Sequence, residues 1–156
     1  MKKILLILAL FSVAIILLTF AYSLFTRSQS AAGLVDGKLT PCLDSPNCVC
    51  SEFPEDTAHD HAIEPIQLPE GVDGMAVMTS VIEDLGGTIQ TSDETYLAAT
   101  FRTKFFRFTD DVEVRLDAEA GVLHIRSASR AGYGDMGLNR ERVEKIRAAF
   151  AEKAAR

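Results

Sequence analysis

The sequence has no tryptophan and only three cysteines, three histidines and three tyrosines among its 156 residues. The absence of tryptophan removes one common aromatic surface for stacking sugars, which leaves Tyr96 and Tyr133 as possible substitutes. The sequence also lacks a Walker phosphate loop, a C-x-x-C pair and the residue order of a serine-histidine-aspartate triad. No standard catalytic motif therefore assigns a reaction to this chain.

Positive charge is scarce outside the N-terminal segment. Three of the 16 basic residues and none of the 22 acidic ones lie in residues 1–27, so the remainder carries a net charge of −9. Binding to nucleic acid depends on clustered lysine and arginine that neutralise phosphates. The charge balance therefore argues against a nucleic-acid partner, and an anionic membrane surface would repel the domain.

One long apolar run occupies residues 4–25. As a helix these residues would extend about 33 Å, enough to cross a hydrocarbon core of about 30 Å. The apolar core of a secretory signal peptide is shorter, at about 7–15 residues, so we expect an uncleaved transmembrane anchor that makes the membrane a partner of the chain. Lys2 and Lys3 place the N-terminus in the cytoplasm and the rest of the chain in the periplasm or another extracytoplasmic space.

The remainder has room for one domain. Residues 1–27 form the anchor, and the small, polar residues 28–40 predict a flexible tether. A single domain follows over residues 41–156, divided into an irregular segment rich in cysteine and proline, 41–72, and a core, 73–153.

Apolar periodicity predicts the elements of that core. Apolar residues recur at helical spacing over 74–85, where Asp73 is the expected N-cap, and a last helix begins near Asn139 as its N-cap. Alternating apolar and polar residues predict four strands, over 88–92, 95–103, 107–117 and 122–130. Short connections favour antiparallel pairing. We expect an α+β fold, in which two helices pack on one face of a four-stranded antiparallel sheet and the other face meets solvent, after an N-terminal transmembrane helix.

Four motifs together resemble one family. They are C-x-D-S-P-N-C-V from Cys42, H-x-I-x-P from His61, F-R-F-x-D-D-V-E from Phe106 and R-S-A-S-R-x-G-Y-x-D-x-G-x-N-R from Arg126. Over most of residues 40–150 the chain resembles the domain-of-unknown-function family 1499. The resemblance implies a small domain, often membrane-tethered or exported, without an agreed substrate. The chain departs from the family pattern at Leu43, where proline is commoner, and at Cys50, where serine is expected.

The cysteines allow two interpretations. Cys42 and Cys48 match the family pattern at both ends of a turn, and an oxidising compartment would permit a disulfide between them, with Cys50 free or competing. The alternative is a zinc or copper site that also uses Cys50, His59 and His61. Since C-x5-C-x-C followed by H-x-H matches no standard zinc module, we expect no metal and no cofactor.

Asp111 and Glu113 are the candidate catalytic residues. Two carboxylates in different environments can act as acid and base, with Arg126 or Arg130 holding an anionic substrate. On a strand both carboxylates lie on one face, where they would equally form salt bridges to basic residues of neighbouring strands. We favour the salt bridges.

The segment from Arg126 to Arg142 is the candidate binding site. Arginines, a glycine-rich loop and a helix N-terminus converge there, which is how proteins hold phosphate or carboxylate groups. The predicted ligand-binding residues are Arg126, Ser127, Ser129, Arg130, Tyr133, Asp135, Asn139 and Arg140. The same glycines and Asp135 could instead serve only the turn between strand and helix. Gly132 to Gly137 spells G-x-G-x-x-G, but no parallel strand can follow, so a dinucleotide site is excluded.

These observations predict a non-catalytic binding or interaction module. Its partner would be an anionic ligand or a cell-envelope protein. A cell-envelope enzyme that uses the aspartate, glutamate and arginine of the polar sheet face is the alternative, and a purely structural role for the anchor is a third.

Overall fold

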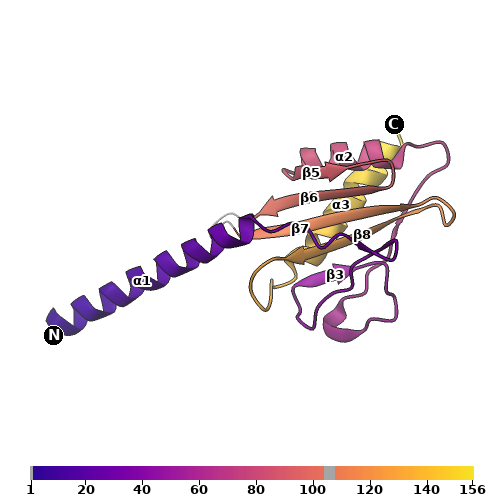
Figure 1. The fold of residues 1–156 in the computed structure, drawn as a ribbon. Helices are drawn as coiled ribbons and strands as arrows, with labels where there is room; N and C mark the ends of the chain where they lie inside the picture. The colour runs from indigo at the N-terminus through magenta and orange to yellow at the C-terminus, as the bar shows by residue number, and fades with distance from the viewer. Residues whose placement is uncertain (1, 104–107) are drawn as a thin grey trace.

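The computed structural model describes residues 2–103 and 108–156, and one long helix stands apart from the rest of the chain (Figure 1). Helix α1 spans Lys2–Arg27 and extends away from a body of strands and helices. Its residues Lys2–Tyr22 have a mean hydropathy of 3.0, and none of that segment is buried. The helix is long and apolar enough to cross a membrane, a criterion that a signal sequence also meets.

The body is built on one antiparallel sheet in the order β3-β8-β7-β6-β5, with β4 paired to β8 as well. The strands are β3 Cys48–Cys50, β4 Ile66–Gln67, β5 Thr88–Ser92, β6 Tyr96–Arg102, β7 Thr109–Asp117 and β8 Val122–Ser129. The α+β class and the four longer strands are as predicted, although Arg107, the first residue of the third predicted strand, lies outside the described residues.

The sheet has six strands in the described residues, two more than the sequence predicts. Strands β3 and β4 come from the segment 41–72, which the sequence predicts to be irregular, and both pair with the edge of β8 that β7 leaves open. They have three and two residues, too few for an alternating pattern to be visible among the prolines and aspartates. At the opposite edge, the register of β5 against β6 shifts between Ile89 and Thr91.

Helices α2, Gly74–Asp84, and α3, Leu138–Ala154, cover one face of the sheet and enclose the apolar core. The Asp73 side chain caps α2 as predicted, accepting a hydrogen bond from the Ala76 backbone N–H at 3.0 Å. The predicted cap of α3 was wrong. Gly137 is the N-cap in a left-handed conformation, and the Asp135 carboxylate accepts from the N–H groups of Gly137 and Asn139.

The other face of the sheet does not open freely to solvent. Residues 33–40, here called the strap, form a small hairpin of β1, Leu34–Val35, and β2, Lys38–Leu39, against β7 and β8. The Gly33 backbone N–H donates to Glu113 Oε1 at 2.6 Å, and the Leu39 side chain is fully buried. The sequence predicts a flexible tether over 28–40, but carboxylates on the sheet accept hydrogen bonds from its backbone and hold its second half in place.

Leu39→Ala should lower the free energy of unfolding by about 2–5 kcal/mol, because it removes a buried leucine between the strap and the sheet. The measurement is urea unfolding of the full chain in a mild detergent, followed by pulse proteolysis. Leu43→Ala is the matched control, since Leu43 is 76% exposed. Equal effects of the two substitutions would show that the strap does not pack on the sheet.

Candidate functional site

Both candidate catalytic carboxylates are held in buried ion pairs on the strap-covered face. Glu113 lies opposite Arg126 in the β7–β8 register, and Arg126 Nη1 donates to Glu113 Oε2 at 2.9 Å. Arg130 donates to both oxygens of Asp111, at 2.8 and 2.6 Å. Asp111 is 5% exposed and Glu113 is not exposed. The Glu113–Arg126 pair is a cross-strand salt bridge of the kind that the sequence predicts, whereas Asp111 pairs with Arg130, which lies just beyond the end of β8.

Tyr96 adds a third contact to Glu113. Its hydroxyl donates to Glu113 Oε1 at 2.6 Å, beside the contact from the strap. Burial and the neighbouring Glu113 carboxylate raise the pKa of Tyr96 well above its ordinary value. The phenol therefore stays protonated and acts as a donor. Glu113 thus joins β6, β7, β8 and the strap.

A further buried carboxylate, Glu52, lies on this face and was not among the predicted site residues. Glu52 follows β3 and is buried, and it accepts from Arg115 Nε at 3.1 Å and from Nη2 at 2.7 Å. The hydrogen bond to Glu52 raises the pKa of Arg115. No periodic pattern surrounds Glu52, because it lies in the segment predicted as irregular, so only the fold reveals its position opposite Arg115.

A serine and a histidine meet nearby without completing a triad. Ser51 Oγ lies 3.3 Å from His124 Nδ1 and accepts from the Ile125 backbone N–H at 2.8 Å. The other ring nitrogen of His124 is 3.9 Å from carboxylate oxygens of both Glu52 and Asp117. That distance exceeds hydrogen-bonding range, so no acid orients the imidazole as a catalytic base requires.

The predicted binding residues divide between the two faces of the sheet. Ser127 and Ser129 point to the helix-covered face, where Ser127 Oγ donates to Asn139 Oδ1 at 2.6 Å and Asn139 Nδ2 donates to Ser129 Oγ at 3.1 Å. Arg126 and Arg130 lie on the other face. The fold therefore brings the serines to Asn139 and separates them from the arginines.

The arginine that lies on the helix-covered face is Arg142, rather than Arg126 or Arg130, and its Nη1 donates to Ser127 Oγ at 3.0 Å. Its Nη2 donates to Asp110 Oδ2 at 2.5 Å, and its guanidinium lies 5.1 Å from the centre of the Phe101 ring. Asp110 shares this face with Val112, as its place in the strand predicts, and Arg142 supplies the partner that a buried aspartate needs.

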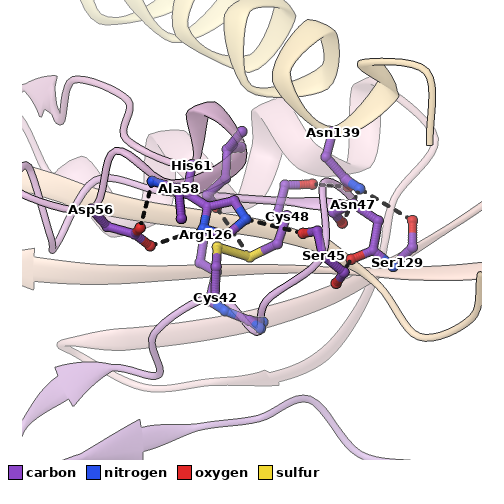
Figure 2. The surroundings of a disulfide bond; sticks show 12 residues. Cys42, Ser45, Asn47, Cys48, Asp56, Ala58, His61, Arg126, Ser129 and Asn139 are labelled. Carbon is purple, nitrogen blue, oxygen red and sulfur yellow. Dashed lines mark hydrogen bonds and ion pairs between the residues drawn. A yellow bond between two sulfur atoms is a disulfide. The ribbon is translucent and has the colours of Figure 1, made fainter. Parts of the chain in front are cut away.

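Asn139 also ties two distant motifs together (Figure 2). Its Nδ2 donates to the Asn47 carbonyl at 2.8 Å, which also accepts from the Ser129 backbone N–H at 3.0 Å. Asn47 Nδ2 in turn donates to the Gly132 carbonyl at 2.6 Å. The turn that precedes β3 is thus bonded to the end of β8, the glycine loop and α3.

The disulfide that the resemblance implied is present. Cys42 and Cys48 are bonded, with their Cα atoms 5.7 Å apart. His61 lies beside this loop and is 2% exposed, with Nδ1 2.9 Å from Asp56 Oδ2 and Nε2 3.0 Å from the Ser45 carbonyl. Each ring nitrogen of His61 therefore has an oxygen within hydrogen-bonding distance, and these two contacts connect Asp56 to the Cys42–Cys48 loop.

The alternative metal site is not assembled among the described residues. Cys42 and Cys48 are bonded to each other, and Nε2 of His59 lies 2.8 Å from Asp44 Oδ1. No cluster of three or more metal-ligating side chains occurs in the described part of the chain.

The remaining predicted residues serve the loop or its surface. Arg140 donates to the carbonyls of Asp60 and Ala62, near the short 3₁₀ helix η1, Ala58–Asp60. Asp135 caps α3. Tyr133 is 68% exposed, and its ring lies edge-on to His59 with the ring centres 6.3 Å apart.

A cavity of about 720 Å³ lies where β6 and β8 end and α3 begins. Its walls are mainly apolar, with basic and acidic side chains among them. The lining residues are Leu85, Phe101, Arg102, Thr103, Phe108, Asp110, Ser129, Ala131, Gly132, Gly134, Asp135, Met136, Leu138, Glu141, Arg142 and Lys145. The cavity is not visible in the sequence, because its lining residues come from four separate segments of the chain. It includes Ser129 and Asp135 of the predicted site.

The comparison with protein families supports the resemblance drawn from the motifs. The family model described as "Protein of unknown function (DUF1499)" matches residues 38–150. The match takes in the whole six-stranded sheet, the disulfide and α2, and most of α3. No curated protein matches the chain.

Asn139→Ala should lower the free energy of unfolding by about 2–3 kcal/mol, because it leaves the buried Asn47 carbonyl and Ser127 hydroxyl short of partners. Urea unfolding of the full chain measures the effect. Gln90→Ala, which removes an exposed amide on β5, is the control and should change stability by less than about 0.5 kcal/mol. A similar small loss for both would contradict the role given to Asn139.

Cys50 should make the fold sensitive to alkali. Burial raises the pKa of its thiol from 9.0 to about 11, so the folded chain keeps a proton that the unfolded chain releases. Stability from this group is complete below pH 9 and falls as the pH rises toward 11. Urea unfolding of wild type and Cys50→Ala between pH 8 and 10.5 should show a steeper alkaline loss in the wild type. Parallel pH profiles would contradict the burial of a neutral thiol.

Proposed function

Since the chain belongs to DUF1499, a family of unknown function, we propose from its site that it is a membrane-anchored extracytoplasmic binding module without catalytic activity. Its ligand is an anionic molecule with an apolar part, and the ligand occupies the cavity beside Arg142. The observation that carries this proposal is the cavity itself. Its volume of about 720 Å³ and its apolar walls with a few polar groups are typical of small-molecule sites.

The charges in the cavity wall support an anionic ligand. Arg102 is exposed, and its side chain makes no ion pair or hydrogen bond with any residue that the structure describes, so its guanidinium is available to a phosphate or carboxylate. Lys145 is also exposed, and its contact with Glu141 is a surface pair that a ligand could replace at little cost. Arg142 is held by Asp110 and contributes a fixed positive group deeper in the wall.

The state of the candidate catalytic residues supports binding over catalysis. Asp111 and Glu113 would have to exchange protons with a substrate, yet each is buried and bonded to an arginine. Burial and the arginine partners together shield both carboxylates from a substrate. Neither carboxylate lines the cavity.

The proposed location follows from the anchor and the disulfide. Helix α1 has the length of a membrane span and exceeds an ordinary signal-peptide core. A disulfide persists in an oxidising compartment, and the Cys42–Cys48 bond therefore supports placement of the domain outside the cytoplasm.

Octyl phosphate is a suitable soluble probe of the cavity. For the full chain in lipid nanodiscs, octyl phosphate at 100 times its Kd should stabilise the folded domain by about 2.7 kcal/mol, whereas inorganic phosphate should have a smaller effect. Thermal unfolding followed by rapid proteolysis measures the shift. Ala131→Trp places an indole in the cavity wall and should abolish the shift.

Two further variants make this test specific. Ala118→Trp adds the same side chain at the β7–β8 turn, away from the cavity, and should keep the full shift. Arg102→Ala should weaken the response to octyl phosphate and leave the response to octanol unchanged. The proposal is wrong if octyl phosphate does not stabilise the wild type, or if it stabilises Ala131→Trp equally.

A further inference from the structure

The strap leaves little free chain between the anchor and the domain. Helix α1 ends at Arg27, and Gly33 is already bonded to Glu113 on the sheet. Six residue steps, even when fully extended, span only about 20 Å. A domain tethered in this way remains at the bilayer surface, and its orientation there is restricted by the point at which the strap begins.

The short connection brings one end of the sheet toward the bilayer. The C-terminal end of α1 lies beside β7, at the end of the sheet where β6 finishes and β7 starts (Figure 1). Phe101 and Arg102 at the end of β6 and Phe108 before β7 line the cavity. The β7–β8 turn, residues 118–121, lies at the opposite end of those strands. The cavity is therefore at the membrane-proximal end.

Exposed apolar side chains mark the same end. Met136 is 99% exposed, and Leu85 and Leu138 are each 40% exposed, and all three line the cavity. Tyr133 in the same loop is exposed as well. Large apolar groups on the surface of a soluble domain, gathered around one opening, are typical of a surface that contacts a membrane or a ligand.

Charge also distinguishes this end from the rest of the domain. The chain after residue 27 has a net charge of −9, which would repel anionic lipids. The cavity lining is balanced, since its three basic residues are matched by three acidic ones. They are Arg102, Arg142 and Lys145 against Asp110, Asp135 and Glu141. The cavity end can therefore approach a bilayer that contains anionic lipid without this repulsion.

We infer that the cavity takes the acyl chain of a phospholipid directly from the bilayer in which α1 is anchored, with the lipid phosphate near Arg102. This inference rests on the proposed function and adds to it the source and class of the ligand. The apolar walls replace the hydrocarbon that surrounds the acyl chain in the membrane, so the transfer does not require the acyl chain to enter water.

The first experiment tests where the cavity lies. Spin labels at Met136→Cys and, as control, at Glu119→Cys in the β7–β8 turn are introduced into the full chain in phosphatidylcholine vesicles. The native cysteines will not compete, because Cys50 is buried and the other two are bonded. The label at 136 should collide with oxygen and be shielded from an aqueous nickel chelate, whereas the label at 119 should show the reverse. Equal exposure of both labels to the chelate would overturn the inference.

The second experiment tests the occupant. A phosphatidylglycerol with a photoreactive acyl chain is added to the same vesicles, and the crosslinked peptides are mapped. Crosslinks should form to the cavity wall as well as to α1, which serves as an internal control. Ala131→Trp should lose the crosslink to the wall, and Ala118→Trp should keep it. Crosslinks to α1 alone in the wild type would overturn the inference.

The two proposals can fail separately. If octyl phosphate binds in the cavity but the lipid does not crosslink there, the binding function stands and the membrane source is wrong. The mass of the mature protein shows whether residues 1–27 are retained. If they have been removed, lipid uptake by a tethered domain is also wrong. If neither probe reaches the cavity, both proposals fall.

Discussion

The burial of Glu113 is the constraint on which much of the structure depends. A carboxylate removed from water is costly unless its oxygens are fully bonded. Glu113 meets this requirement with Arg126, the Tyr96 hydroxyl and the Gly33 backbone N–H, which come from two strands and from the strap. One side chain thus requires the strands to be in register and the strap to lie across the sheet. In the membrane-anchored form that we propose, the same contacts also restrict the position of the domain relative to the membrane.

Two of the four motifs that carry the family resemblance, those from Cys42 and Arg126, meet in space and form one hydrogen-bonded network. The Asn47 carbonyl receives hydrogen bonds from Asn139 and from Ser129, and the Cys42–Cys48 bond fixes the turn in which Asn47 lies. A polar network of this kind costs stability if any member is left unpaired, so its parts depend on one another. The network joins the disulfide loop to the end of β8 and to the start of α3. The residues of the network, Asn47, Ser129 and Asn139, therefore have a structural role. The cavity beside the network is the feature for which packing supplies no explanation.

The sequence predicted those parts of the fold that repeat a period. Alternation located the strands from β5 to β8, and Asp73 marked the start of α2. Strands β3 and β4 carry no such period, and Glu52 gave no local sign that it would meet Arg115. The predicted binding residues were correctly recognised as unusual, but neighbours in sequence on a strand alternate between faces. Ser127 and Arg126 therefore had to separate, and only the fold could show that Arg142 joins the serines.

The shifted register of β5 affects whether the sheets of two copies of the chain can pair edge to edge. In the membrane-anchored form that we propose, copies of the chain diffuse in two dimensions and meet more often than they would in solution, and an open strand edge would then favour pairing of one sheet with another. Strands β3 and β4 already cover part of the edge at β8. At the other edge, β5 is short and polar, and the irregularity between Ile89 and Thr91 interrupts the row of backbone donors and acceptors. Both edges of the sheet therefore oppose edge-to-edge pairing between copies of the chain.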